Sequence, residues 1–135
     1  MSNTATSKFS TALLQAPSAN AVAVPIGGWM LQGFSQAIMA SGRFAQLSVT
    51  SGFGDAANMD LIRNGQGQGA AVGYATQWGA YGSVDTAIRI INGEKALVQG
   101  DGMQMVDKDN NVPPTGDYTG NVDFKTAYKK IWGIS

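Results

Sequence analysis

The chain has 135 residues, 44% of them hydrophobic, and its nine basic and nine acidic side chains cancel. This length and composition predict a single globular domain over residues 1–135, and the balanced charge argues against nucleic acid as a partner. The sequence contains no histidine and no cysteine, which removes the usual general base, the usual zinc ligand, thiol nucleophiles and disulfides. We therefore expect no catalytic residue and no metal site. No apolar run reaches the ~18 residues of a membrane helix.

The first half of the chain alternates between helical and strand-like patterns. Apolar residues at helical spacing predict helices over Thr4–Gln15, Trp29–Ser41 and Ala56–Asn64. Between them, short continuous apolar runs predict buried strands at Ala21–Pro25 and Leu47–Ser51.

The alternation continues in the second half, with a third predicted strand at Ala70–Ala75 and a shorter fourth at Met103–Asp107. A turn-rich tail, residues 108–135, ends in a predicted helix from about Asp123 to Trp132. Between the third and fourth strands lies the clearest helical pattern, with an apolar stripe of Tyr81, Val84, Ala87, Ile88 and Ile91. Strands that alternate with helices of about 10–14 residues predict an α/β fold, three-layer, with a mostly parallel sheet.

One glycine-rich loop, GFGDAA at residues 52–57, has the pattern and position of a dinucleotide-binding loop. The acidic residue expected about 20 residues further on, to bind the ribose, is missing, since the chain there reads VGYAT. The alternative is a tight turn at Gly52 and Gly54, with Asp55 capping the next helix. We favour the turn, because Asp55 would also repel a pyrophosphate, and we expect no cofactor.

Aromatic residues stand beside small or polar residues in the loops that follow the first three predicted strands. In open parallel sheets, ligands bind beyond the carboxyl ends of the strands. Aromatic faces with a few amide and carboxylate groups suit a neutral sugar or polyol. For Trp29 and Trp78, which open helices, inward packing remains the alternative. The predicted ligand-binding residues are Gly27, Gly28, Trp29, Phe53, Asp55, Tyr74 and Gln77.

The segments AVAVPIGGWMLQGFSQAIMASGR, LSVTSGFGDAANMDLIRNGQ and AAVGYATQWGAYGSVDTAIRIINGEK, in this order, resemble the C-terminal part of type 1 periplasmic solute-binding proteins of sugar ABC transporters. The tail GMQMVDKDNNVPPTGDYTGNVDFKTAYKKIWG is also similar to the end of some members, so the resemblance covers nearly the whole chain. It implies a flavodoxin-like lobe of a periplasmic-binding-protein-like fold that binds a sugar or polyol without catalysis. It also implies an ABC transporter permease as partner and a periplasmic location, although the chain as written shows no signal peptide and would stay cytoplasmic.

The family's ligand-gripping positions match only in part. The family often has an Asn-Asp type pair where Gly27 and Gly28 stand, and Gly-Phe-Asp where this chain places Asp55 one residue late. The identity of the sugar therefore stays open. The effector domain of a LacI-like repressor is a related interpretation, but the sequence shows no helix-turn-helix pattern, and the long tail fits transport proteins better.

The resemblance further implies that the chain is only the last part of a two-lobed protein, in which the 81–91 stripe packs on a lobe whose main body is absent here. Leaving five such side chains exposed forfeits about 5–10 kcal/mol of burial. Either the third strand remains in one compact domain, or two chains exchange the part after Gly69 as a swapped dimer. We expect a homodimer or larger oligomer. The alternative function is a truncated structural or self-associating module with no small ligand.

Overall fold

The computed structural model describes residues 3–25, 28–100 and 102–134. The elements, in chain order, are α1 (Asn3–Gln15), β1 (Ala21–Val24), α2 (Gly28–Ala40), the short 3-10 helix η1 (Phe44–Gln46), β2 (Ser48–Gly52), α3 (Ala56–Asn64), β3 (Ala70–Gly73), α4 (Thr76–Ile91), β4 (Gln104–Asp107) and α5 (Phe124–Trp132).

The four strands form one sheet in the order β1-β2-β3-β4. Strands β1, β2 and β3 are parallel, with Ala21 opposite Ser48 and Thr50 opposite Ala70. Only β4 is antiparallel, with Val106 opposite Ala71. The α/β class and the mostly parallel sheet predicted from the alternating pattern are therefore confirmed.

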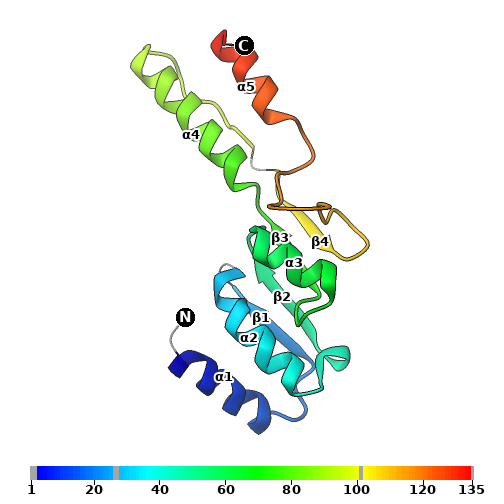
Figure 1. The fold of residues 1–135 in the computed structure, drawn as a ribbon. Coiled ribbons are helices and arrows are strands. Elements are labelled where there is room, and N and C mark those ends of the chain that lie inside the picture. Colours follow the sequence, from blue (N-terminus) through cyan, green and yellow to red (C-terminus); the bar gives the residue numbers. More distant parts are fainter. Residues whose placement is uncertain (1–2, 26–27, 101, 135) are drawn as a thin grey trace.

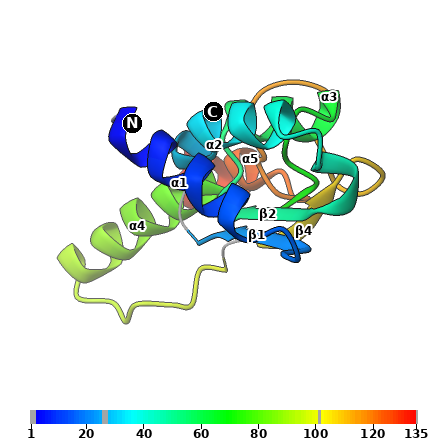
Figure 2. The same ribbon diagram turned by 90° about the horizontal axis from the view of Figure 1, so that it is seen from below.

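Helices α1, α2 and α3 lie together on one face of the sheet (Figure 1, Figure 2). Because side chains alternate between the two faces of a strand, every second strand residue points at these helices. Val24, Val49 and Ala71 are buried there. Helix α2 contributes Leu31 and Ile38, both fully buried, and α1 packs on α2 through the stacked rings of Phe9 and Phe34, 4.3 Å apart. The hydrophobic core thus sits between the sheet and this helical layer.

The opposite face of the sheet is largely uncovered. Ala21, Ala23 and Thr50 are exposed on it. Val72 and Met105, which are neighbours across β3 and β4, are 44% and 59% exposed. The alternation that buries one set of strand side chains therefore leaves the other set facing solvent.

Helices α4 and α5 extend away from one end of the sheet, and we call them, with residues 92–100, the helical arm (Figure 1). Tyr81 of α4 stacks on Trp132 of α5, with ring centroids 5.5 Å apart, and packs edge-on against Phe124. Asp85 of α4 accepts hydrogen bonds from Arg89 Nε at 2.7 Å and from Trp132 Nε1 at 3.0 Å. These contacts join the two helices independently of the sheet.

Several predicted details change in the structure. Strand β3 ends at Gly73, not Ala75, and α4 begins at Thr76. The 81–91 stripe divides in two. Tyr81 packs against α5, whereas Val84, Ile88 and Ile91 remain 49%, 38% and 83% exposed. The chain takes the path that the family resemblance implies: it leaves the sheet after β3, forms α4 and returns to the sheet as β4.

Candidate functional site

The carboxyl ends of β1, β2 and β3 meet at one edge of the sheet because these strands are parallel. There the loop after β2, the start of α4 and the tail enclose a cavity of about 240 Å³, which we call the strand-end pocket. Its volume lies just below the range of ~300–1,000 Å³ that is usual for small-ligand sites. It is lined by Gly54, Asp55, Thr76, Gln77, Asp117 and Tyr118.

Two carboxylates of this pocket cap the same helix. Asp55 is the N-cap of α3 and accepts a hydrogen bond from the Asn58 amide at 3.1 Å. Asp117, from the tail, accepts one from the Ala56 amide at 2.8 Å. The helix N-terminus, which otherwise attracts anions, is thus occupied by the protein's own carboxylates. An anionic ligand would meet two negative charges here, so the pocket suits a neutral ligand better.

Tyr118 fastens the tail to the sheet and forms one wall of the pocket. Its backbone amide donates to the Gly54 carbonyl at 2.7 Å, and its buried hydroxyl lies 2.6 Å from Gln104 Oε1. Burial raises the pKa of this hydroxyl, which therefore stays neutral. A Cβ on Gly54 would lie 2.5 Å from Tyr118 Cβ, and one on Gly73 would lie 2.9 Å from its ring. Both glycines are needed so that the aromatic ring can approach the strand ends.

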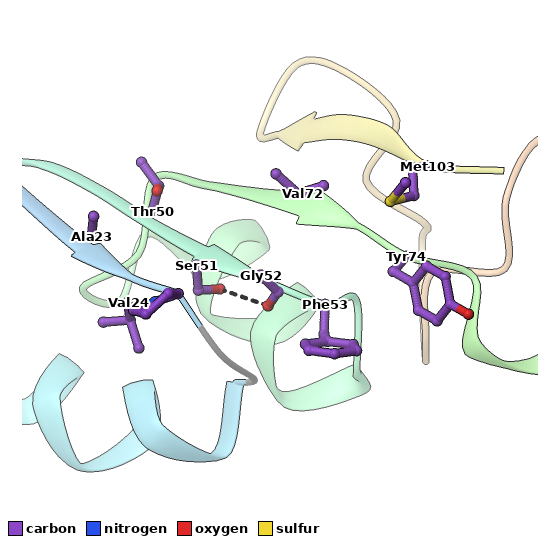
Figure 3. A pocket seen from close by; sticks show the side chains of 10 residues that line it. Ala23, Val24, Thr50, Ser51, Gly52, Phe53, Val72, Tyr74 and Met103 are labelled. Carbon is purple, nitrogen blue, oxygen red and sulfur yellow. Dashed lines mark hydrogen bonds between the residues drawn. The ribbon is translucent and has the colours of Figure 1, made fainter. Parts of the chain in front are cut away.

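A second cavity, about 570 Å³ in volume, lies on the uncovered face of the sheet, and we call it the sheet-face trough (Figure 3). Small residues of β1 and β2 form its floor, and at one end Phe53 and Tyr74 meet edge to face, with ring centroids 5.8 Å apart. Phe53 is 42% exposed and has a φ of +61°, a left-handed conformation that is unusual for an aromatic residue. The trough is lined by Ala23, Val24, Pro25, Thr50, Ser51, Gly52, Phe53, Val72, Tyr74 and Met103.

The structure places the predicted site residues in two neighbouring groups. Phe53 and Tyr74 share the trough, whereas Asp55 and Gln77 line the strand-end pocket. Gly28 is the first residue of α2, while Gly27 and the side chain of Trp29 lie outside the described residues. The assignment of all seven to a ligand site stays a prediction.

Trp78, the other tryptophan considered for stacking on a ligand, packs within the protein. Its ring stacks on Phe124 of α5, with centroids 5.8 Å apart and planes inclined by 12°. It also lies against Gly102 and Gly120, where a Cβ would meet the indole ring. Inward packing, the alternative interpretation of this residue, therefore holds.

Sequence reasoning missed Thr76, Asp117 and Tyr118 of the strand-end pocket. Thr76 stands in the loop after the third predicted strand but was not selected, because only the aromatic, amide and acidic side chains there were chosen. Asp117 and Tyr118 come from the turn-rich tail, and Asp117 lies 61 residues after Ala56, whose amide it caps. No local pattern signals so distant a contact.

Neither a metal-binding cluster nor a membrane-spanning helix occurs among the residues that the structure describes. In residues 3–25, 28–100 and 102–134, no group of three or more His, Cys, Asp or Glu side chains is placed to hold a metal ion. Over the same ranges, no helix is both long enough and apolar enough to cross a membrane.

No family model and no curated protein matches the chain. Solved structures do match in fold. GanP, a glucose-galactose binding protein from Geobacillus stearothermophilus, has a TM-score of 0.68 at 16% identity, over 78% of this chain and 38% of its own. An ABC transporter solute-binding protein from Agrobacterium vitis, bound with alpha-D-tagatopyranose, has a TM-score of 0.66 at 16% identity, over 83% and 37%.

A third match, a 5-methylthioribose transporter solute-binding protein from Thermotoga lettingae in complex with 5-methylthioribose, has a TM-score of 0.68 at 21% identity. It covers 94% of this chain and 44% of its own. The chain thus spans well under half the length of these neighbours. At these identities the likeness concerns the fold, and it confirms the resemblance at that level: this chain has the α/β fold of part of a sugar ABC transporter solute-binding protein.

Proposed function

We propose that the chain is a non-catalytic module that binds a neutral, hydroxyl-rich solute at the carboxyl ends of its strands. The observation that carries the proposal is the strand-end pocket, which lies where ligands of open parallel sheets bind and presents hydrogen-bonding groups without a cation. The neighbours of the same fold are named for binding glucose and galactose, tagatopyranose and 5-methylthioribose. Those names support the solute class but do not identify the solute.

The chemistry of the site favours sugars and polyols over charged ligands. Asp55, Thr76 and Gln77 offer oxygen acceptors and amide or hydroxyl donors of the kind that bind sugar hydroxyls. The nearby Phe53–Tyr74 pair offers aromatic surface for the C–H face of a ring. No Lys or Arg is among the residues lining either cavity, so an anion would find no charge-assisted hydrogen bond.

The cellular role follows from the same proposal. A module of this kind would deliver its solute to an ABC transporter permease from the periplasmic side of the membrane. The chain spans 37–44% of the neighbours' lengths. In this proposal the pocket forms one side of a site that a second lobe would complete.

A thermal-shift screen over sugars, polyols, organic anions and nucleotides tests the solute class. A ligand at 100 times its dissociation constant adds about 2.7 kcal/mol of stability, which raises the melting temperature by several degrees in a domain of this size. Stabilisation by neutral sugars or polyols is expected. A preference for anions, or no response to any neutral hydroxylated compound, would contradict the proposal.

Matched variants then locate the site. Gln77→Ala should weaken binding of any solute found in the screen, whereas Gln36→Ala, at an exposed position of α2, should not. Gly79→Ala is a subtler variant, because a Cβ there would collide with the Tyr74 hydroxyl and move that ring. Alanine also favours the helix by about 1 kcal/mol, so reduced binding by a protein that has not lost stability would implicate Tyr74 in the site. Unchanged binding in both Gln77→Ala and Gly79→Ala would place the site elsewhere.

A second candidate function, a structural module that associates with itself, is favoured by a separate observation. Val84, Ile88 and Ile91 form an exposed apolar stripe along α4, and such a contiguous patch is typical of an interaction surface. Sedimentation equilibrium at micromolar concentration tests this candidate, for which a dimer or larger assembly is expected. A strictly monomeric mass would rule it out.

A further inference from the structure

Two apolar surfaces of the chain are left uncovered in the structure. The first is the sheet-face trough, whose floor consists of the small residues Ala23, Thr50 and Gly52, flanked by Val72 and Met103. Val72 and Met103 are 44% and 61% exposed. In α/β proteins a helix normally covers such a face. The trough therefore has the composition of a helix-packing face without a helix on it.

The second surface is the exposed stripe of α4, formed by Val84, Ile88 and Ile91. These side chains recur every three to four residues, which is the spacing of a helix face that packs on a sheet. Close to the end of the helix, Ile90, Leu97 and Val98 are 62%, 56% and 101% exposed. The helix that a sheet face requires is thus present in the chain but away from its own sheet.

The connection between the two surfaces prevents them from meeting within one molecule. Only Tyr74 and Ala75 link β3 to α4, and α4 runs away from the sheet and is bound to α5 (Figure 1). Gly79, near the start of α4, lies so close to the Tyr74 hydroxyl that a Cβ there would collide with it. The α4 stripe cannot fold back over the sheet unless this junction is rebuilt.

We infer that the occupant of the sheet-face trough is α4 of a second copy of this chain. This inference rests on the self-association proposed above and names its contact surfaces. When each of two copies places its α4 on the other's sheet, the arrangement closes around a two-fold axis and leaves neither surface free. No strand has to be exchanged, because β3 and β4 stay in their own sheet.

The area available is that of a weak to standard dimer interface. Fully burying one large apolar side chain removes about 60–120 Å² from water. The nine apolar side chains of the two surfaces are on average about 60% exposed. They supply roughly 300–650 Å² per chain, while a standard interface buries about 800 Å² per partner. Ala23 and Thr50 of the trough add a smaller area. The side chains counted are Phe53, Val72, Val84, Ile88, Ile91, Leu97, Val98, Met103 and Met105.

Cross-linking tests the contact directly, because the chain contains no cysteine of its own. One sample carries Thr50→Cys, and a second, with a longer tag, carries Ile88→Cys. After mixing and mild oxidation, the disulfide-linked heterodimer should form in about tenfold excess over the same mixture made with Leu14→Cys, at an exposed position on α1. Equal yields from the two mixtures would overturn the inference.

Dissociation constants give a second, independent measurement. Val72→Asp and Ile88→Asp each place a charge in the interface and should raise the dimer dissociation constant at least about tenfold, while Leu14→Asp should leave it unchanged. A dimer that survives both substitutions would refute the helix-in-trough contact but keep self-association as a function. A monomeric wild-type chain would refute both, even if another polypeptide were found to cover the trough.

Discussion

Gly54 and Tyr118 pack so closely that position 54 has no room for a side chain. The Gly54 carbonyl accepts a hydrogen bond from the Tyr118 amide at 2.7 Å, and a Cβ on Gly54 would come within 2.5 Å of Tyr118 Cβ. The glycine pattern that suggested a dinucleotide loop therefore has a different physical cause. The glycine admits an aromatic residue of the tail, and Asp55 next to it caps α3.

Gly54→Ala should destabilise the protein by about 1–3 kcal/mol, because the added methyl group overpacks a buried contact with the Tyr118 stem. Denaturant unfolding measures the change. Gly69→Ala is the matched control, since its Cβ would meet only Val49 O, at an ordinary 3.6 Å. That control should be neutral or slightly stabilising because alanine restricts the unfolded chain.

A double-mutant cycle on Gly54 and Tyr118 measures the energetic coupling between them and tests the same contact more strictly. Tyr118→Ala alone should cost about 3–5 kcal/mol through the lost aromatic ring. In the Tyr118→Ala background, the added methyl of Gly54→Ala gains room, so the double variant should be less destabilised than the sum of the single variants. Strict additivity would mean that the two side chains do not meet.

Neither NAD nor FAD should bind to the GFGDAA loop. The Ala56 amide, which a pyrophosphate would use, already donates to Asp117, and Tyr118 covers the adjacent glycine. Calorimetric titration with each nucleotide at micromolar protein concentration should show no saturable heat. Saturable binding of either nucleotide that is lost in Gly54→Val would show that the loop rearranges to accept it, contrary to this expectation.

Features that depend on residues close together in the sequence were predictable, whereas features that depend on residues far apart were not. The strands and helices follow from local periodicity, so the parallel sheet was predictable from the segments 21–25, 47–51 and 70–75. Asp55 as an N-cap and Gly65 as the end of α3 were also predictable, because capping depends on one or two residues.

Features that depend on the tail were not predictable. Tyr81 shares helical spacing with Val84 and Ile88, yet it faces α5 and they face solvent. Helical periodicity places residues on one face of a helix, but it does not predict where α5, much further along the chain, will pack. The strand-end pocket shows the same limit, since Asp117 and Tyr118 reach it from a segment without regular structure.

Phe53→Gly should destabilise the protein by about 1 kcal/mol and weaken solute binding. Glycine relieves about 1–2 kcal/mol of strain at a φ of +61°. The substitution removes the edge-to-face contact with Tyr74, which contributes about 0.5–1.5 kcal/mol. It also removes the burial of a ring that is only 42% exposed, a loss of about 1–2 kcal/mol, so the losses exceed the gain. Thermal unfolding and solute titration on the same sample separate the effects on stability and on binding. Unchanged solute binding would remove Phe53 from the proposed site.

Asp85→Asn should destabilise the protein at neutral pH and make it less sensitive to acid. The hydrogen bond from Arg89 holds the pKa of Asp85 below its usual value of 3.8, with further hydrogen bonds from Gln99 and Trp132. A carboxyl whose folded-state pKa lies below its unfolded-state pKa stabilises the fold above the unfolded value. This stabilisation is lost as the pH falls from about 4 through the lower folded-state pKa.

The experiment compares urea unfolding of the wild type and Asp85→Asn at neutral pH and at several pH values below 5. At neutral pH the variant should lose about 1–3 kcal/mol, since hydrogen bonds to a charged group are replaced by hydrogen bonds to a neutral amide. As the pH falls below 4 and passes the lowered folded-state pKa, the two proteins should converge, because the wild-type carboxyl then loses its charge. Asp60→Asn is the matched control, since Asp60 pairs with Arg63 on an exposed surface, where an ion pair contributes about 0–1 kcal/mol. Parallel pH profiles for the wild type and Asp85→Asn would show that Asp85 does not hold α4 and α5 together through its charge.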